Sequence, residues 1–259
     1  MARIGIHTIF VARENILFLE EWLDYHADLG ITDFYLYDNS RSIGRSGSTP
    51  TQNKYGIEFD ALTKQWSDQE VASEISRVAS KCSARCEIIS WEPKDDQGRV
   101  VYEQCKSIVD CANRAGECDW LGFIDMDEFL FSPSGEKLED LLEIADECGG
   151  VTMLQKKFED RFLNMGSPVT GITRCIEGID TSAWAPKMFV RKGALKKEEV
   201  GIVHWLPVEG GSKALDPSRL RFNHYNVNDR LLDWARGFYQ DPSLDLNAED
   251  DSLSRRLGK

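Results

Sequence analysis

The sequence predicts an α/β protein with a mostly parallel sheet flanked by helices, followed by a half that is rich in loops. Short apolar runs alternate with segments of helical periodicity through residues 1–155, and this alternation favours parallel strands joined by helices. Of the 259 residues, 41% are hydrophobic and 10% are aromatic. The chain can therefore bury enough apolar surface to form a core.

The first half is expected to alternate strands and helices. Residues 4–12 form an apolar run, which is typical of a strand buried on both faces. Apolar residues at helical spacing over 16–27 predict a helix that ends at Gly30, and 34–37 predict the second strand. Ser67 to Glu70 predict a capping box that opens a helix over 67–82. Further strands are expected at 86–91, 120–124 and 151–154, and further helices over 101–112 and 138–145.

The second half, from residue 156, lacks this alternation. Isolated strands are expected at 187–191, 201–206 and 220–225, followed by a helix over 229–238. Residues 41–56 are rich in Ser, Gly and Thr and predict a mobile loop. We expect 1–155 and 156–240 to form two halves of one domain, with 241–259 as a frayed or disordered tail.

Charge and cysteine content argue against several classes of function. The chain has 31 Lys and Arg against 44 Asp and Glu, a net charge of −13, which disfavours a nucleic-acid surface or an anionic-membrane anchor. Its longest apolar run is much shorter than the roughly 20 residues that a helix needs to span a bilayer, and it carries no secretion signal. A cytoplasmic protein without a transmembrane segment is therefore expected. Seven cysteines without a Cys-x-x-Cys pair predict reduced thiols rather than disulfides or a zinc site.

Acidic residues follow two of the expected strands. Asp38 comes directly after 34–37, and Asp125 to Glu128 follow 120–124. In parallel sheets, ligands bind at the carboxyl ends of the strands. Asp125 and Asp127 are one residue apart, so both carboxylates can reach one cation, and their oxygens suit Mg²⁺ or Mn²⁺ better than zinc. The alternatives are a solvated acidic turn for this segment and an ordinary Asx-turn for Asp38.

Two longer segments resemble the signatures of a known family. FVARENILFLEEWLDYHADLGITDFYLYDNS at 10–40 and DWLGFIDMDEFLF at 119–131 are similar to the paired signatures of GT-A glycosyltransferases of the family-92-like group, also called DUF23 or family-2-like. The resemblance covers most of residues 3–240. It implies a Rossmann-like GT-A fold, a nucleotide-sugar donor such as a UDP-hexose, and a Mn²⁺ or Mg²⁺ cofactor. It also implies transfer to a carbohydrate or other hydroxyl acceptor, with 1–155 binding the donor and 156–240 facing the acceptor.

The resemblance also implies roles for individual residues. Asp127 would be the direct metal ligand, Asp125 would contact the ribose or the metal, and Asp38 would bind the base or ribose. Thr8, Arg13 and Asn15 would lie near the nucleotide. The chain departs from the family at Arg13-Glu14-Asn15, where the family has Lys-Asn-Glu, and at 226–228, where relatives often carry Lys-Ser.

An inverting sugar transfer requires a carboxylate base, which takes the proton of the acceptor hydroxyl. Asp160 and Glu159 are the first candidates because they follow the expected strand at 151–154, and Glu177 and Asp180 are next. Each of these acids is alternatively a solvated loop residue. Aromatic residues that could stack on a sugar, or equally belong to the core, are Trp184, Trp205 and Tyr225.

Two late histidines are candidates for a further metal ligand. His204, which ends an apolar run, is the first choice, and His224 is the second. Each is alternatively a hydrogen-bonded structural residue. His7 and His26 are expected to be structural, because one lies in a buried strand and the other beside the apolar face of the first helix.

Two other functions are also compatible with the sequence. One is a non-catalytic protein that binds a nucleotide or glycan, suggested by the departure at Glu14 and Asn15. The other is a Mg²⁺-dependent nucleotidyltransferase, which also places paired acids at the edge of a sheet. That chemistry usually brings a phosphate-binding loop, and residues 40–47 lack the P-loop order.

Overall fold

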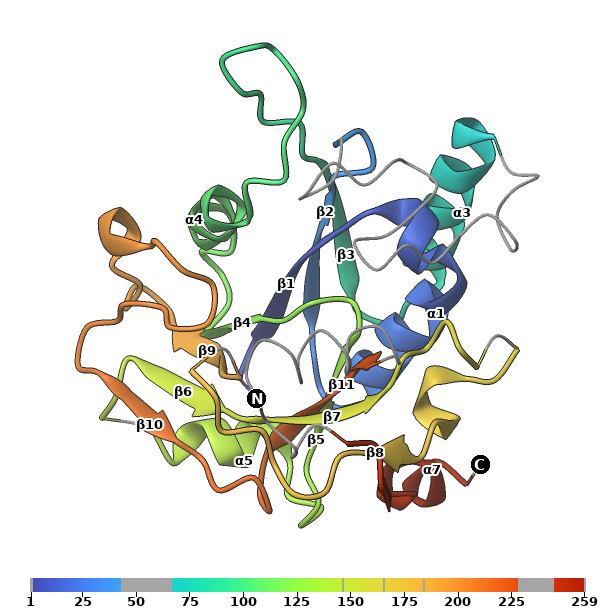
Figure 1. The fold of residues 1–259 in the computed structure, drawn as a ribbon. Helices are drawn as coiled ribbons and strands as arrows, with labels where there is room; N and C mark the ends of the chain where they lie inside the picture. The colour runs from blue at the N-terminus through green and yellow to red at the C-terminus, as the bar shows by residue number, and fades with distance from the viewer. Residues whose placement is uncertain are drawn as a thin grey trace.

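The computed structural model describes residues 2–42, 67–145, 147–164, 166–183, 185–227 and 245–258, with the Arg13 side chain left out. It contains a seven-stranded sheet and a five-stranded sheet (Figure 1). In spatial order, the larger sheet consists of β10 (Ser212–Ala214), β6 (Gly150–Met153), β9 (Lys187–Arg191), β4 (Trp120–Phe123), β1 (Ile4–Phe10), β2 (Asp33–Asp38) and β3 (Arg85–Ser90). Only β9 runs against its neighbours, so the expected mostly parallel sheet is confirmed.

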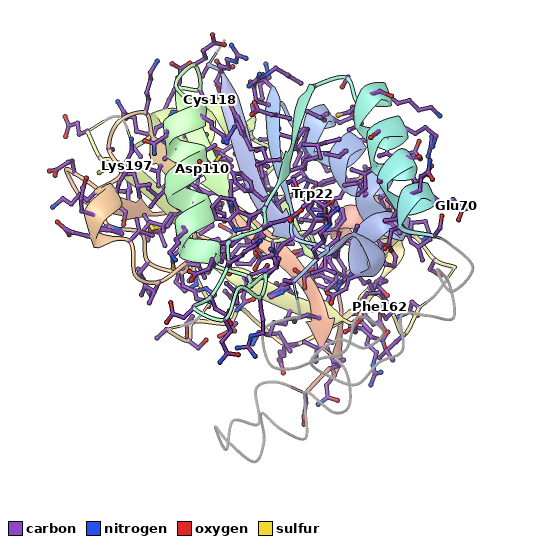
Figure 2. All side chains as sticks on the ribbon, turned by 90° about the horizontal axis from the view of Figure 1, so that it is seen from above. Trp22, Glu70, Asp110, Cys118, Phe162 and Lys197 are labelled. Carbon is purple, nitrogen blue, oxygen red and sulfur yellow. The ribbon has the colours of Figure 1, made fainter. Side chains whose placement is uncertain are left out.

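Helices cover both faces of this sheet. The helices α1 (Ala12–Asp28) and α3 (Asp68–Lys81) lie on one face, and α4 (Gln104–Arg114) lies on the other. Figure 2 shows this arrangement from above, with Asp110 of α4 and Glu70 of α3 on opposite sides of the strands. The short α5 (Leu138–Glu143) joins the core on the side of α1. The central strands β1, β2 and β4 are therefore buried on both faces, as the continuous apolar runs predict.

Local sequence signals explain where the helices begin and end. Gly30 adopts a φ of +103° just after α1, a left-handed conformation that favours glycine. At the start of α3 the capping box is complete: the Glu70 amide donates to Ser67 Oγ at 3.3 Å, and the Ser67 amide donates to Glu70 Oε2 at 2.6 Å. The expected helices at 16–27, 67–82, 101–112 and 138–145 are all confirmed, with shifted ends.

The smaller sheet was not expected from the sequence. In spatial order it consists of β12 (Ala248–Glu249), β8 (Arg174–Cys175), β7 (Gln155–Glu159), β11 (Arg221–Val227) and β5 (Glu128–Phe131). The strand β11 is antiparallel to β5 and parallel to β7. In Figure 1 this sheet lies beside α7 (Ser252–Arg256) and the C-terminus. The described residues also contain the two 3-10 turns Val169–Gly171 and Lys197–Glu199.

Two expectations for the second half are wrong. Residues 201–206 form an irregular segment instead of a strand, because their apolar side chains Val203 and Leu206 pack into the core beside α4 without strand pairing. The described part of the tail, 245–258, is ordered rather than frayed, since β12 pairs with β8 and Leu253 of α7 is buried. The helix expected at 229–238 and most of the loop at 41–56 lie outside the described residues.

Two other expectations are confirmed. All seven cysteines are free thiols. His7 and His26 are both structural and buried. His7 Nε2 lies 2.9 Å from Ser107 Oγ, and His26 bridges the Trp22 carbonyl oxygen at 2.8 Å and the Leu130 amide at 3.2 Å. In the described parts of the chain, no helix combines the length and the apolar character needed to cross a membrane.

Candidate active site

The acidic segment Asp125 to Glu128 forms the turn that links the two sheets, and we call it the acidic turn. The chain leaves the larger sheet after β4, and the Glu128 amide donates to the Asp125 carbonyl oxygen at 3.0 Å as β5 begins in the smaller sheet. Asp125 and Asp127 therefore lie at the carboxyl end of β4, which is where open parallel sheets place their ligands. The expected position of this segment at the edge of the sheet is confirmed.

Asp125 is held by two neighbouring elements. Gln104, the first residue of α4, donates to Asp125 Oδ1 at 2.9 Å, and Lys187 Nζ donates to Oδ2 at 2.6 Å. Lys187 begins β9, and because β9 is antiparallel to β4, its first residue lies at the carboxyl end of β4. Burial opposes ionisation of Asp125, but Lys187 more than offsets this effect and lowers the pKa of the carboxyl.

Lys187 also pairs with Glu128, at 3.3 Å from Oε2. The Lys187 side chain is 3% exposed and the Glu128 side chain 1%, so this pair is buried. Burial raises the pKa of Glu128 to about 7. Burial alone would lower the pKa of Lys187, but Asp125 and Glu128 raise it above its ordinary value, so the ammonium stays charged.

Asp127 contacts two groups from the second half of the chain. The His224 Nε2 atom lies 3.4 Å from Asp127 Oδ2, and Arg161 Nη1 lies 3.5 Å from the same oxygen. The register of β11 on β5 pairs His224 with Glu128, which brings the histidine beside Asp127. Burial opposes ionisation of Asp127, but His224 in its protonated form, together with Arg161, lowers the pKa of its carboxyl below the ordinary value.

The other residues predicted to bind the donor lie along β1, α1 and β2. Thr8 is fully buried in β1, and its hydroxyl has no hydrogen-bond partner among the described residues. Asn15 is buried in α1, and Asp38 ends β2, where its Oδ1 accepts the Ser40 amide at 3.0 Å. The carboxyl end of β2 is two strands from that of β4 in the sheet. The Arg13 side chain is not described. Their roles stay predictions.

The predicted bases have partners within the protein. Asp160 is buried, and its Oδ1 accepts the Phe162 amide at 2.8 Å. Glu159 accepts a hydrogen bond from Asn164 at 2.8 Å and pairs with Arg174 at 3.1 Å. These contacts give both carboxylates a structural task, and their catalytic role stays a prediction. Of the two alternatives, Glu177 is exposed and Asp180 pairs with Lys157 at 2.9 Å.

His204 lies outside any strand, and its Nδ1 is 3.2 Å from the Pro186 carbonyl oxygen. Burial, and then the charge of Lys187, lower its pKa. The histidine in contact with Asp127 is His224, the second choice from the sequence. Trp205 is 46% exposed, Tyr225 is in the core, and Trp184 lies outside the described residues.

No role was predicted from the sequence for four residues that contact the acidic turn or His224: Lys187, Gln104, Arg161 and Gln155. Lys187 had one detectable signal, since it is a single charge at the start of the apolar run Met188 to Val190. The other three carry no local pattern, because their contacts depend on how distant segments pack.

The described residues hold no group of three or more His, Cys, Asp and Glu side chains arranged to bind a metal ion. The donors that do meet are one carboxylate oxygen, from Asp127, and one imidazole nitrogen, from His224. This mixed pair suits Mn²⁺, and hard cations in nucleotide sites commonly complete their coordination with phosphate oxygens and water. The residues present therefore fit a cation that is shared with a bound diphosphate.

Comparisons with known proteins agree with the sequence signatures. A glycosyltransferase family 92 protein from Ricinus communis is 25% identical over 218 residues, covering 80% of this chain and 33% of that protein. One from Oryza sativa subsp. japonica is 26% identical over 231 residues, covering 82% of this chain and 32% of that protein. The chain thus spans about a third of the length of these curated relatives.

Solved structures show weaker likeness. The galactosyltransferase LgtC, in complex with donor and acceptor sugar analogues, matches at 10% identity and a TM-score of 0.33, covering 98% of this chain and 70% of that one. A glycosyltransferase involved in glycosylation of the major capsid of PBCV-1 matches at 12% identity and a TM-score of 0.34, covering 89% and 96%. The profile of glycosyltransferase family 92 matches residues 85–255, which is more than half of the sequence, and the chain belongs to this family.

Proposed function

We propose that this chain is a metal-dependent glycosyltransferase that moves a sugar from a nucleotide-sugar donor, a UDP-hexose foremost, to a carbohydrate or other hydroxyl acceptor. The observation that carries the proposal is the meeting of Asp127 and His224 at the carboxyl end of β4, 3.4 Å apart. Family membership supports the reaction class. The position at the end of a parallel strand supports a nucleotide site.

Asp127 and His224 would hold the cation, Mn²⁺ or Mg²⁺. When bound, the cation supplies Lewis-acid stabilisation of the charge that develops on the departing nucleoside diphosphate. The pair is suited to this task because a carboxylate and a neutral imidazole both offer lone pairs and together carry a single negative charge. His204 remains the alternative third ligand.

Asp125 would act differently from Asp127. Both of its oxygens already accept hydrogen bonds, from Gln104 and Lys187, which fixes the orientation of the carboxylate. Its side chain is still 32% exposed, so an oxygen can accept a further hydrogen bond from a ribose hydroxyl. Lys187 and Arg161 bring positive charge to the acidic turn and keep it from repelling a diphosphate.

The transfer is proposed to invert the anomeric carbon, which requires a carboxylate to take the proton of the acceptor hydroxyl. Asp160 and Glu159 remain the predicted bases. A base that acts only in the chemical step lowers turnover without weakening donor binding. We therefore expect Asp160→Asn or Glu159→Gln to lower turnover about a hundredfold at unchanged UDP affinity.

The test of the proposed function is release of nucleoside diphosphate from a panel of nucleotide sugars, with Mn²⁺ and with excess chelator. Mn²⁺-dependent turnover of a UDP-hexose is expected, with loss of turnover in Asp127→Asn and in His224→Gln. Asp140→Asn, which changes an exposed carboxylate in α5, is the matched control and should keep full activity. Binding of UDP-hexoses without turnover on any hydroxyl acceptor or water would favour the non-catalytic alternative.

A further inference from the structure

A buried glutamine connects His224 to the acidic residue Asp180. Gln155 is the first residue of β7 and is 4% exposed. Its Nε2 donates to Asp180 Oδ2 at 2.9 Å, while its Oε1 lies 2.6 Å from His224 Nδ1. The main chain supports the same link, because the Asp180 amide donates to the Gln155 carbonyl oxygen at 2.9 Å. A chain of hydrogen bonds thus runs from Asp180 through Gln155 to the imidazole.

The direction of this chain follows from the chemistry of its ends. An ionised carboxylate can only accept hydrogen bonds. Asp180 is kept ionised because Lys157 Nζ lies 2.9 Å from Oδ2 and the Ser182 amide donates to Oδ1 at 2.9 Å. Gln155 must therefore turn its amino group to Asp180 and its oxygen to His224. An amide oxygen is an acceptor, so the proton of the 2.6 Å contact belongs to His224 Nδ1.

A neutral imidazole with its proton on Nδ1 has its lone pair on Nε2. That nitrogen is the one that lies 3.4 Å from Asp127 Oδ2. Two lone pairs facing each other at this distance repel unless a cation or a proton lies between them. A bound divalent cation would turn this repulsion into two coordination bonds.

We infer that Gln155 is a positioning residue that holds His224 in the Nδ1-protonated tautomer, so that Nε2 and Asp127 present one binding position to a divalent cation. This inference rests on the proposed metal dependence. Metal-binding histidines in general donate their second ring N–H to a carboxylate, a carbonyl or water, which fixes the ring and its tautomer. Here the acceptor is a side-chain amide that is itself oriented by Asp180.

The first test uses the whole chain without metal. Two-bond ¹⁵N–¹H correlation spectra distinguish the two neutral tautomers of a histidine, and the chain has only four histidines to assign. His224→Gln identifies the resonances of His224 by their loss. The spectra are recorded at a pH at which the His224 shifts report a neutral ring. Protonation on Nδ1 is expected, and protonation on Nε2 would overturn the inference.

The second test measures Mn²⁺ binding through the electron paramagnetic resonance signal of the free ion, first with Mn²⁺ alone and then with UDP added, because the proposed cation also binds a diphosphate. Gln155→Leu removes the acceptor and should weaken Mn²⁺ binding about tenfold or more. In the double variant Gln155→Glu with Asp180→Asn, the carboxylate and the amide exchange positions. An oxygen at position 155 then still accepts the proton of His224 Nδ1. The double variant should bind Mn²⁺ within about threefold of the wild-type chain. Gln97→Leu, at an exposed loop position, is the control and should change nothing.

The outcomes separate this inference from the proposed function. If the wild-type chain binds Mn²⁺ and Gln155→Leu binds it equally well, Gln155 has no positioning role. The double variant could also lose Mn²⁺ as fully as Gln155→Leu does while both keep the wild-type circular dichroism spectrum. In that case an acceptor for His224 Nδ1 does not determine Mn²⁺ binding, and the inference also fails. If the wild-type chain binds no Mn²⁺ either alone or with UDP present, the proposed metal dependence itself is overturned, whatever tautomer His224 adopts.

Discussion

Replacement of Lys187 by methionine tests the charge balance beneath the acidic turn. Methionine keeps the unbranched shape of the side chain and removes the ammonium group. The change deprives Asp125 of a partner at 2.6 Å and Glu128 of one at 3.3 Å. We expect a large loss of stability, because Glu128 would remain buried without a compensating charge.

The size of the loss can be worked from the exposure of each partner. Breaking a buried ion pair by removing one partner costs about 3–5 kcal/mol. Lys187 and Glu128 are buried, but Asp125 is 32% exposed and keeps its hydrogen bond from Gln104, so water and the amide compensate part of its loss. The lower end of that range, about 3 kcal/mol, is therefore expected for Lys187→Met.

The assay is urea unfolding at pH 9, which lies above the Glu128 pKa of about 7, so that Glu128 is ionised in the wild-type chain. Unfolding is followed by tryptophan fluorescence and circular dichroism. Adding Glu128→Gln to Lys187→Met removes the unpaired charge and should recover about 1 kcal/mol or more of the unfolding free energy. A double-mutant cycle of these contacting residues measures the recovery. Lys106→Met, which breaks an exposed pair with Glu103, is the control and should cost at most about 1 kcal/mol. A loss below about 1 kcal/mol for Lys187→Met would refute the buried-pair reasoning.

Three further predictions concern stability. Gly122→Ala should cost about 1–3 kcal/mol in urea unfolding, because the new Cβ would lie 2.5 Å from a phenylalanine ring atom, whereas Gly116→Ala meets no atom within 4 Å and should cost less than about 1 kcal/mol. Burial lowers the pKa of His7 and of His26 from 6.5 to about 3. The stability that the two neutral rings contribute is therefore full above about pH 6.5 and is lost as the pH falls towards 3. The free energy of unfolding should fall between pH 7 and pH 5, and it should fall less steeply when either histidine is replaced by glutamine. Burial opposes ionisation of Asp33, but hydrogen bonds from two arginines lower its pKa to about 2; the stability difference between Asp33→Asn and the wild-type chain should be about 1–3 kcal/mol at pH 7 and close as the pH falls from 4 to 2.

The sequence predicted the parallel part of the larger sheet because strands covered on both faces leave a continuous apolar run. The runs that became β1, β2 and β4 are of this kind, and each helix between them had an apolar face or a cap. The same logic placed Asp38 and Asp125 at carboxyl ends of strands. These predictions needed only local pattern and the geometry of parallel connections.

The direction of β9 and the existence of the smaller sheet could not be predicted in this way. An apolar strand has the same composition whichever way it runs, so nothing in Lys187 to Arg191 shows that it is antiparallel. The strand β7 reads Gln-Lys-Lys-Phe-Glu, with too few apolar residues to be recognised. Residues 201–206 were wrongly predicted to form a strand because they are apolar. Their side chains, among them Val203 and Leu206, are buried although the segment has no regular structure.

The candidate site could be predicted from the sequence only in part, for the same reason. The position of Asp127 at the end of a strand was predicted from the local pattern, but its contact with His224 depends on the register between β11 and β5, nearly a hundred residues apart in the chain. Choosing His204 over His224 rested on local β-propensity, which carries no information about register.

The most direct test of the central claim is calorimetric titration of the chain with UDP, in Mn²⁺ and in excess chelator, with the Asp127→Asn variant alongside. If Asp127 and His224 hold a cation that binds the diphosphate, UDP binds the wild-type chain only in the presence of Mn²⁺, and Asp127→Asn weakens this binding at least tenfold. Equal UDP affinity in Mn²⁺ and in chelator, or unchanged affinity in Asp127→Asn, would contradict the account.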